Sequence, residues 1–171
     1  PMEYSLITNP MINVNADQDR TSRNFFLNAY ANILLPVKGL SFRVNYGYNY
    51  RSGFTGTYYG RDTHEGREQG GLVGGKAAIN NNHYNDYTWE NVLRYELDLD
   101  KHRLDATGLF SMQETKSVAS AQSAEGFVTD DTSYFMMGTA ERNQKISSSL
   151  SETAMLSYML RLNYAYAGKY M

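Results

Sequence analysis

Charged side chains stand at alternate positions in several stretches of the chain, where they could do acid–base chemistry. They are Arg43, Glu90, Arg94, Glu96, Asp98, Arg103, Asp105 and Arg161. A glycosidase uses two carboxylates about 5 to 10 Å apart. Because polar positions of neighbouring strands face one another in any sheet, a ladder of ion pairs along a wet wall explains the same residues more simply. We therefore predict no catalytic residue and no enzymatic activity.

Possible metal ligands are grouped in two other places. These are Asp62, His64, Glu65 and His83 in one, and Asp130-Asp131 in the other. Their spacing fits no defined ligand loop. The glycine-rich run at 66–75 lacks the Gly-Lys-Ser/Thr ending of a phosphate loop. The sequence predicts solvated loops with no metal and no cofactor.

A third group combines aromatic and charged side chains: Tyr58, Tyr59, Arg61 and Asp62. Exposed aromatic rings beside polar groups suit stacking and hydrogen bonding to a sugar or a peptide. We predict that the four residues lie on an extracellular loop and contact the ligand or a lid protein. The alternative is a packed loop that contacts neighbouring loops or a lid protein.

Composition excludes some classes of protein. The 171 residues carry a formal charge of −2, which suggests no nucleic-acid partner. No apolar run approaches the roughly 20 residues of a membrane helix, and mean hydropathy is −0.55. Without cysteine there is no disulfide framework. Because the chain begins at Pro1 without an export signal, we expect it to be a piece of a longer polypeptide.

Two alternating segments, 24–35 and 40–51, are joined by Pro36-Val37-Lys38-Gly39. In a strand, alternate side chains share a face. One face of the second segment carries Leu40, Phe42, Val44, Tyr46, Tyr48 and Tyr50. Pairing Leu35 with Leu40 places apolar positions opposite apolar positions throughout, which predicts a β-hairpin. A dozen residues at about 3.3 Å each, tilted by about 40°, rise close to the roughly 30 Å of a bilayer core.

The same pattern recurs later in the chain. Segment 87–99 alternates, Asp100-Lys101 makes a tight turn, and segment 102–113 returns with Asp98 opposite Arg103 as a charge pair. A fifth alternating segment covers 156–166, and Tyr170-Met171 would begin a sixth strand. We read residues 1–20, 52–85 and 115–151 as loops, with a short strand extension near Phe127 or Phe135 in the last. We also predict that the second and third strands pair directly, despite the link between them.

Short turns thus alternate with long loops, as in outer-membrane barrels. With the short turns on the periplasmic side, Tyr46, Tyr48, Tyr50, Tyr87 and Trp89 fall near the outer rim of the apolar face. Tyr164, Tyr166 and Tyr170 fall near the inner rim. Amphipathic rings prefer the membrane–water interface. The sequence therefore predicts an all-β, antiparallel up-and-down meander that is a segment of a transmembrane β-barrel.

Four motifs in order resemble barrel strands of the SusC/RagA family of TonB-linked outer-membrane transporters. They are Lys38-Gly39-Leu40-Ser41-Phe42-Arg43-Val44-Asn45-Tyr46-Gly47, Trp89-Glu90-Asn91-Val92-Leu93-Arg94-Tyr95, His102-Arg103-Leu104-Asp105-Ala106-Thr107, and Arg161-Leu162-Asn163-Tyr164-Ala165-Tyr166 with Lys169-Tyr170. The resemblance spans about residues 9–171. The family often has Gly before the Arg of its Arg-Val-Asn-Tyr motif, where this chain has Leu160.

The resemblance implies a 22-stranded barrel in the outer membrane of a Gram-negative cell. It also implies a plug, a TonB-contacting segment near the N-terminus, a SusD-like surface lipoprotein as a lid, and import of a glycan or a peptide. Residues 1–171 would be a partial barrel domain of about five strands, without the plug. The rival interpretations are a soluble β-sandwich that binds glycans and a β-rich hydrolase.

Overall fold

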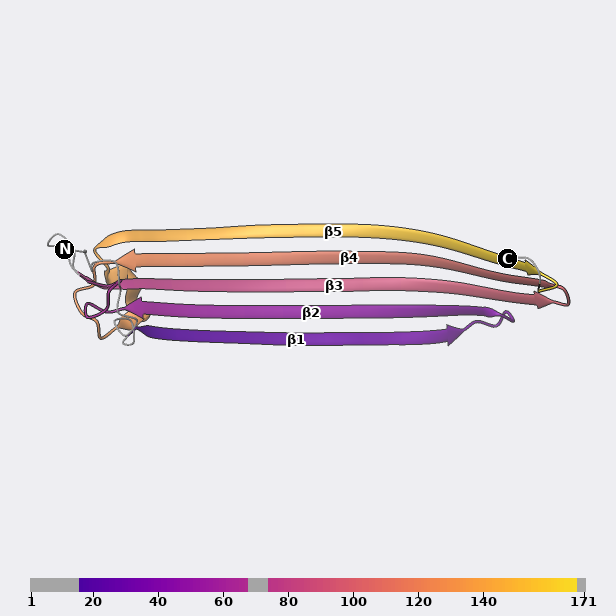
Figure 1. Cartoon of the computed structure of the whole chain (residues 1–171), viewed down its shortest axis with the longest axis horizontal. Helices are drawn as coiled ribbons and strands as arrows, with labels where there is room; N and C mark the ends of the chain where they lie inside the picture. Colours follow the sequence, from indigo (N-terminus) through magenta and orange to yellow (C-terminus); the bar gives the residue numbers. More distant parts are fainter. Residues whose placement is uncertain (1–15, 68–73, 169–171) are drawn as a thin grey trace, which may run out of the picture. The chain divides into compact units, whose positions relative to one another are not determined.

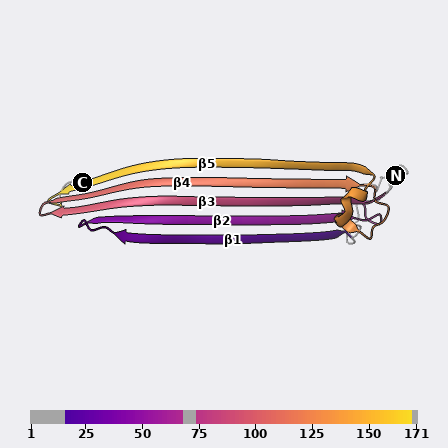
Figure 2. The same cartoon turned by 180° about the vertical axis from the view of Figure 1, so that it is seen from behind.

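The computed structural model describes residues 16–67 and 74–168. Its elements are β1 (Asp17–Leu34), β2 (Leu40–Tyr59), β3 (Lys76–Leu99), β4 (His102–Glu125), the 3-10 helix η3 (Ser133–Thr139) and β5 (Arg142–Tyr166). All five strands form one sheet in the order β1-β2-β3-β4-β5 (Figures 1 and 2). The predicted all-β antiparallel meander is confirmed. Within the described ranges there is no second sheet, which a sandwich would require.

The chain divides into two compact units. The strand unit comprises Asn24–Tyr50, Tyr84–Ser117 and Ser151–Met171, and the loop unit comprises Pro1–Arg23, Arg51–His83 and Val118–Leu150. All of the buried apolar residues belong to the loop unit, as far as the described residues go. No helix in the described part of the chain is long and apolar enough to cross a membrane.

The first hairpin has the predicted register. The amide of Leu35 donates to the carbonyl of Leu40 at 3.2 Å, and the amide of Leu40 donates to Val37 at 3.0 Å. Gly39 completes the turn with φ of 84°, a left-handed conformation that favours glycine. Its carbonyl then accepts the amide of Glu96 in β3 at 2.8 Å. The glycine thus serves both the turn and the pairing of β2 with β3.

Strands β2 and β3 are neighbours, as predicted, although a long link separates them in sequence. Asn45 donates to Glu90 at 3.2 Å on one face of the sheet. On the other face the rings of Tyr48 and Tyr87 stack with centroids 5.7 Å apart and an interplanar angle of 13°. Both contacts fit a single antiparallel register.

The strand unit has two chemically different faces. The aromatic face carries Phe25, Tyr46, Tyr48, Tyr87, Trp89, Phe110 and Tyr158, which contact one another across neighbouring strands. The polar face carries Asn45, Asp86, Glu90, Arg94 and Asp105, which share hydrogen bonds or ion pairs with polar neighbours. The period-two assignment made from the sequence is therefore correct.

Charges on the polar face form a local ladder of ion pairs and hydrogen bonds. One guanidinium nitrogen of Arg94 lies 2.7 Å from a carboxylate oxygen of Asp105 and 2.7 Å from one of Glu96. Asp86 accepts hydrogen bonds from Gln113 at 3.1 Å and from Thr115 at 2.8 Å.

The prediction of a charge pair between Asp98 and Arg103 is wrong. The ion pairs within the described ranges do not include one between these residues. Arg94 pairs instead with Asp105, which lies diagonally across β3 and β4.

The strands extend well beyond the predicted ones, which corrects all three loop assignments. The link after β2 covers only 60–75 rather than 52–85, and the link after β4 covers 126–141 rather than 115–151. Strand β1 begins at Asp17, inside the range read as a loop. The range 133–139 is a 3-10 helix, so the strand extension near Phe135 is wrong, whereas β4 does extend to Glu125, close to Phe127. The start of a sixth strand at Tyr170-Met171 lies outside the described residues.

Candidate functional site

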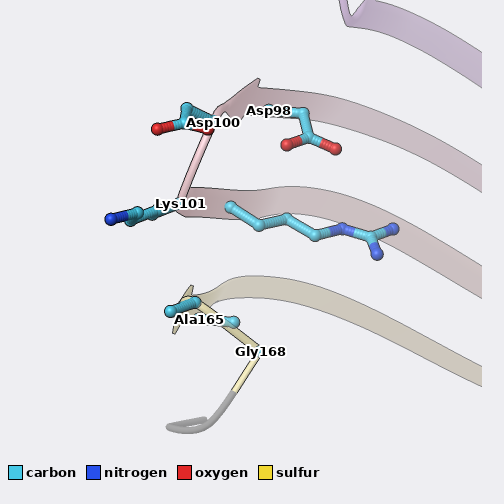
Figure 3. A pocket seen from close by; sticks show the side chains of 7 residues that line it. Asp98, Asp100, Lys101, Ala165 and Gly168 are labelled. Carbon is cyan, nitrogen blue, oxygen red and sulfur yellow. The ribbon is translucent and has the colours of Figure 1, made fainter.

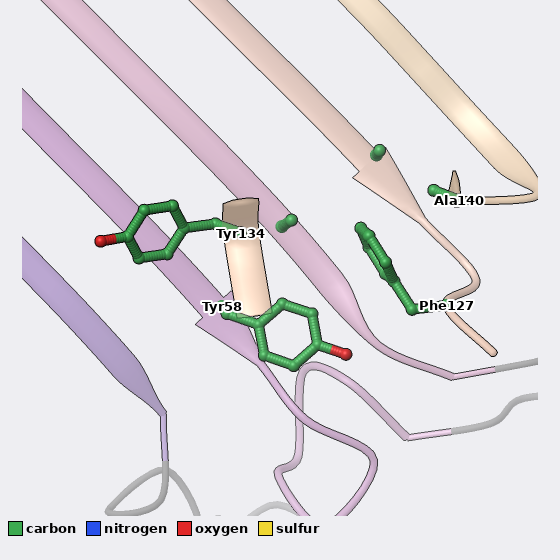
Figure 4. Close-up of a cluster of buried hydrophobic side chains, with 6 residues drawn as sticks. Tyr58, Phe127, Tyr134 and Ala140 are labelled. Atoms are coloured by element: carbon green, nitrogen blue, oxygen red, sulfur yellow. The ribbon is translucent and has the colours of Figure 1, made fainter. Parts of the chain in front are cut away.

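The buried apolar side chains gather where β2 and β4 end in the two long links. They are Tyr58, Ala77, Ala124, Phe127, Tyr134 and Ala140 (Figure 4). Backbone bonds join the links directly, because Phe127 donates to Gly74 at 2.9 Å and Gly126 donates to Gly75 at 3.0 Å. The links therefore form a single packed cluster, which we call the loop cluster.

Tyr58 lies at the centre of the loop cluster. Its side chain is 2% exposed, and its ring meets Phe127 edge to face at 5.4 Å. Its hydroxyl donates to the Asp130 carboxylate at 2.7 Å. Burial, and then the bond to Asp130, raise the pKa of Tyr58 well above its usual value. For this residue the structure matches the alternative weighed from the sequence, a packed loop contacting its neighbour.

Arg61 ties the link 60–75 to the link 126–141. Its guanidinium donates to the carbonyl of Phe127 and, at 2.5 Å, to the carbonyl of Val128. Its backbone amide lies 3.4 Å from an Asp130 oxygen, and its Nε lies 4.0 Å from the other. Arg61 and Tyr58 thus hold one carboxylate between them, an arrangement that we call the Asp130 clasp.

Replacing Arg61 with alanine should loosen the link 126–141 while leaving the strands folded. Two carbonyls and Asp130 are then without their charged donor, but the Arg61 side chain is 36% exposed and water replaces part of the interaction. We expect a local cost of about 1–2 kcal/mol, seen as faster amide hydrogen exchange across 126–141. Arg67→Ala is the control, because Arg67 is exposed on the same link. Equal exchange in both variants would contradict the clasp.

The other two predicted contact residues lie at the surface of the loop unit. Tyr59 is the last residue of β2 and is half-buried, and Asp62 is exposed in the link that follows. Between them and the next strand, a turn is held by buried Thr63, whose hydroxyl donates to Gly60 at 2.7 Å and accepts from Gly66 at 3.0 Å. Contact of Tyr59 or Asp62 with a ligand or a lid remains a prediction.

Helix η3 presents residues that the sequence reasoning missed. Tyr134 anchors the helix by donating to Asp19 and by lying over Gly56, where an added Cβ would be 2.6 Å from the ring. The Asp19 carboxylate raises the pKa of Tyr134 to about 12. Phe135 and Met136 remain 75% and 51% exposed. The apolar run 134–137 inside a polar link was the available signal.

The predicted interface aromatics form two groups within the strand unit. The rings of Tyr46 and Trp89 meet with centroids 6.1 Å apart, and the ring of Tyr48 stacks on that of Tyr87, as the strand pairing requires. At the short-turn end, the ring centroid of His102 lies 5.9 Å from that of Tyr164 and 5.0 Å from that of Tyr166. Their role at a membrane interface remains a prediction.

A groove lies beside the turn between β3 and β4. It is lined by Asp98, Asp100, Lys101, Arg103, Ala165, Ala167 and Gly168 (Figure 3). The backbone carbonyl of Lys101 accepts a hydrogen bond from the amide of Ala167 at 2.6 Å. This bond holds the end of β5 against the turn. Across residues 16–67 and 74–168, no three His, Asp or Glu side chains are grouped to bind a metal ion.

Curated relatives match nearly the whole chain. TonB-dependent receptor P3 of Formosa agariphila is 30% identical over 168 residues, which is 98% of this chain and 16% of that protein. TonB-dependent receptor P26 of the same organism is 24% identical over 170 residues, 96% of this chain and 17% of that protein. The chain thus spans about a sixth of the length of these relatives. No family model matches the sequence.

Solved structures share the fold. The RagAB peptide transporter superposes with a TM-score of 0.77 at 20% identity, over 92% of this chain and 17% of that one. The RagAB peptide importer in its closed-closed state gives a TM-score of 0.78 at 20% identity, over 94% of this chain and 17% of that one. The resemblance inferred from the strand motifs is therefore confirmed: over nearly its whole length this chain is similar to a segment of TonB-dependent receptors, and its fold is that of part of the RagAB transporter.

Proposed function

We propose that this chain is five consecutive strands in the wall of an outer-membrane barrel that imports a nutrient by the TonB-dependent route. The observation that supports the proposal most is the two-faced strand unit, whose aromatic face carries ring groups near both ends. An aromatic face faces lipid and a hydrogen-bonded polar face lines a wet lumen in barrels of this kind. The named relatives are receptors and transporters, which agrees with a non-enzymatic role.

The barrel interpretation brings partners with it. Five strands cannot close a barrel, for which about eight are needed, so the remaining wall and a plug would come from the rest of the polypeptide. The TonB complex would act through a segment outside residues 1–171. A SusD-like surface lipoprotein would cover the long links, and the imported ligand would be a glycan or a peptide.

Loss of the full-length protein from its host should abolish energy-dependent uptake of one ligand class. The experiment compares uptake of labelled oligosaccharides and labelled oligopeptides by wild-type and deletion strains. We expect one class to be lost and restored by the intact gene. Two results together would overturn the proposed function: unchanged uptake of both ligand classes in the deletion strain, and absence of the protein from the outer-membrane fraction of the wild-type strain.

Tyr59 and Asp62, at the surface of the loop unit, should contact the ligand or the lid, and the clasp residues Tyr58 and Arg61 should support them. Alanine at Tyr59 and Asp62 is expected to weaken lipoprotein or substrate binding by about tenfold, because a central contact is worth more than 1 kcal/mol. Alanine at Tyr58 or Arg61 should instead act through loop order, visible by hydrogen exchange. Unchanged binding of both partners in a variant with alanine at all four positions would remove the idea.

A further inference from the structure

The polar face of the strand unit has a depression centred on Gly47 of β2. A side-chain carbon built on Gly47 would lie 3.2 Å from the side-chain oxygen of Asn28 in β1 and 3.7 Å from the Cβ of Thr88 in β3. Gly47 is not among the glycines with positive φ, so no turn requires it. What this glycine contributes is the absence of a side chain between two polar neighbours.

Eight positions on three strands surround Gly47. The bond between Leu35 and Leu40 sets the register of β1 with β2, and the bond between Asn45 and Glu90 sets that of β2 with β3. Strands about 4.8 Å apart and residues about 3.3 Å apart give a patch of about 10 Å by 13 Å. Its three rows are Phe26, Asn49 and Asp86; Asn28, Gly47 and Thr88; and Tyr30, Asn45 and Glu90. All of these except Tyr30 line one groove.

Two aromatic rings stand on the polar face at the β1 side of this groove. Phe26 and Tyr30 are 68% and 67% exposed. The guanidinium of Arg43 lies over the Tyr30 ring, 4.6 Å from its centroid, which holds that ring in place. An exposed, flat apolar ring beside polar groups suits stacking against the C–H face of a sugar.

The polar groups around Gly47 can both donate and accept hydrogen bonds. Within residues 16–67 and 74–168, the side chains of Asn28, Asn49 and Thr88 make no hydrogen bond to another protein group. Amides and hydroxyls have donors and acceptors, as sugar hydroxyls do. The carboxylates of Asp86 and Glu90 belong to none of the ion pairs in the described ranges. They can accept charge-assisted hydrogen bonds from hydroxyls, and they repel anions.

We propose that the Gly47 groove binds one or two units of a neutral oligosaccharide on its way through the barrel lumen. The inference rests on the proposed function and deepens it, because it places the polar face in the lumen and selects a glycan over a peptide. Asp86 and Glu90 disfavour an acidic sugar. A lysine or arginine side chain only donates hydrogen bonds, so it would leave the amide donors of Asn28 and Asn49 without an acceptor.

The first test measures binding to the full-length protein in detergent by calorimetry. The probes are neutral hexasaccharides of glucose, mannose and xylose, and the comparators are an oligogalacturonate and a lysine-rich peptide. We expect a neutral probe to bind and both comparators to fail. Phe26→Ala removes the stacking ring and Gly47→Leu fills the depression, so each should weaken binding by about tenfold. Ser41→Leu, on the same face of β2 but outside the groove lining, should bind as the wild type does.

The second test reports on the groove itself. In the full-length protein, Asn28→Cys should react with a charged maleimide, and a saturating neutral probe should slow that reaction about tenfold. Asn32→Cys is the matched control, because Asn32 lies on the same face of β1 outside the groove lining and should not be protected. A heat-modifiable band on a gel confirms that each variant is folded.

Several results would overturn the glycan site and leave nutrient import standing. They are failure of every neutral probe, preference for the lysine-rich peptide, and binding that neither Phe26→Ala nor Gly47→Leu changes. If Asn28→Cys is unreactive without any probe while Asn32→Cys reacts, another part of the polypeptide covers the groove, and the site is overturned as well. The import function fails separately, through unchanged uptake in the deletion strain and absence of the protein from the outer membrane.

Discussion

Replacing Val44 with arginine is expected to destabilise the full-length protein by about 2–4 kcal/mol in a bilayer. Val44 lies on the same face of β2 as Tyr46 and Tyr48, near the middle of the strand unit, where its surroundings would be hydrocarbon. An arginine there must be desolvated or must distort the bilayer to reach water. Chemical unfolding of the protein in lipid vesicles, followed by intrinsic fluorescence, measures the change.

Asn45→Arg is the matched control, one residue away on the polar face. Its side chain would project beside the Glu90 carboxylate, which Asn45 already contacts at 3.2 Å. A cation is compatible with that position, so the cost should be small. If Val44→Arg is tolerated while Asn45→Leu unfolds the protein, the assignment of faces is inverted.

Replacing Gly39 with valine should cost roughly 2–4 kcal/mol, because two separate requirements fail together. Its φ of 84° is unfavourable for a β-branched residue. An added Cβ would also lie 1.9 Å from the carbonyl oxygen of Glu96. Relieving that clash separates β2 from β3 and breaks the bond from the Glu96 amide to the Gly39 carbonyl.

Lys38→Val isolates the effect of glycine, because Lys38 is exposed in the same turn and is not among the residues with positive φ. We expect a lower unfolding midpoint for the Gly39 variant and a nearly unchanged one for the Lys38 variant. Equal midpoints would show that the turn does not control the pairing of β2 with β3.

Strand pairing was predictable because a membrane-length strand leaves a regular pattern. The alternation of residues 40–51 sets which side chains share a face, and the Pro-Gly turn sets the partner of Leu35. Both are local facts of sequence, and the contact of Phe25 with Tyr48 across the first hairpin follows from them. The adjacency of β2 and β3 needed one further principle, that spanning strands satisfy their backbone groups with lateral neighbours.

The extent of the strands was not predictable, because beyond the alternating segments both faces carry polar or small residues. Gly53 illustrates the difficulty: it reads as a loop residue but sits in β2, where an added Cβ would be 2.1 Å from the Asn82 side chain of β3. Glycine there accommodates the close approach of the Asn82 side chain rather than a turn. Without the hydrophobic period, sequence gives no sign that pairing continues.

The loop cluster was only half foreseen for a related reason. Tyr58 and Arg61 were singled out by residue type, which cannot distinguish a ligand contact from a packing contact. The partner that decides the matter is Asp130, 72 residues from Tyr58 in the sequence. Likewise, Tyr134 anchors η3 only because Gly56 leaves room for its ring. Such long-range complementarity has no local signature.

The central claim is that the aromatic face of these strands lies against lipid and the polar face against water. Single cysteines placed along Leu40 to Tyr50 of β2 in the full-length protein test it most directly, since this segment has no native cysteine. The labelling reagents are a membrane-soluble maleimide and a charged maleimide. The account predicts strict alternation, with even-numbered positions modified from the lipid and odd-numbered positions protected from it. Loss of the alternation, or its inversion, would contradict the account.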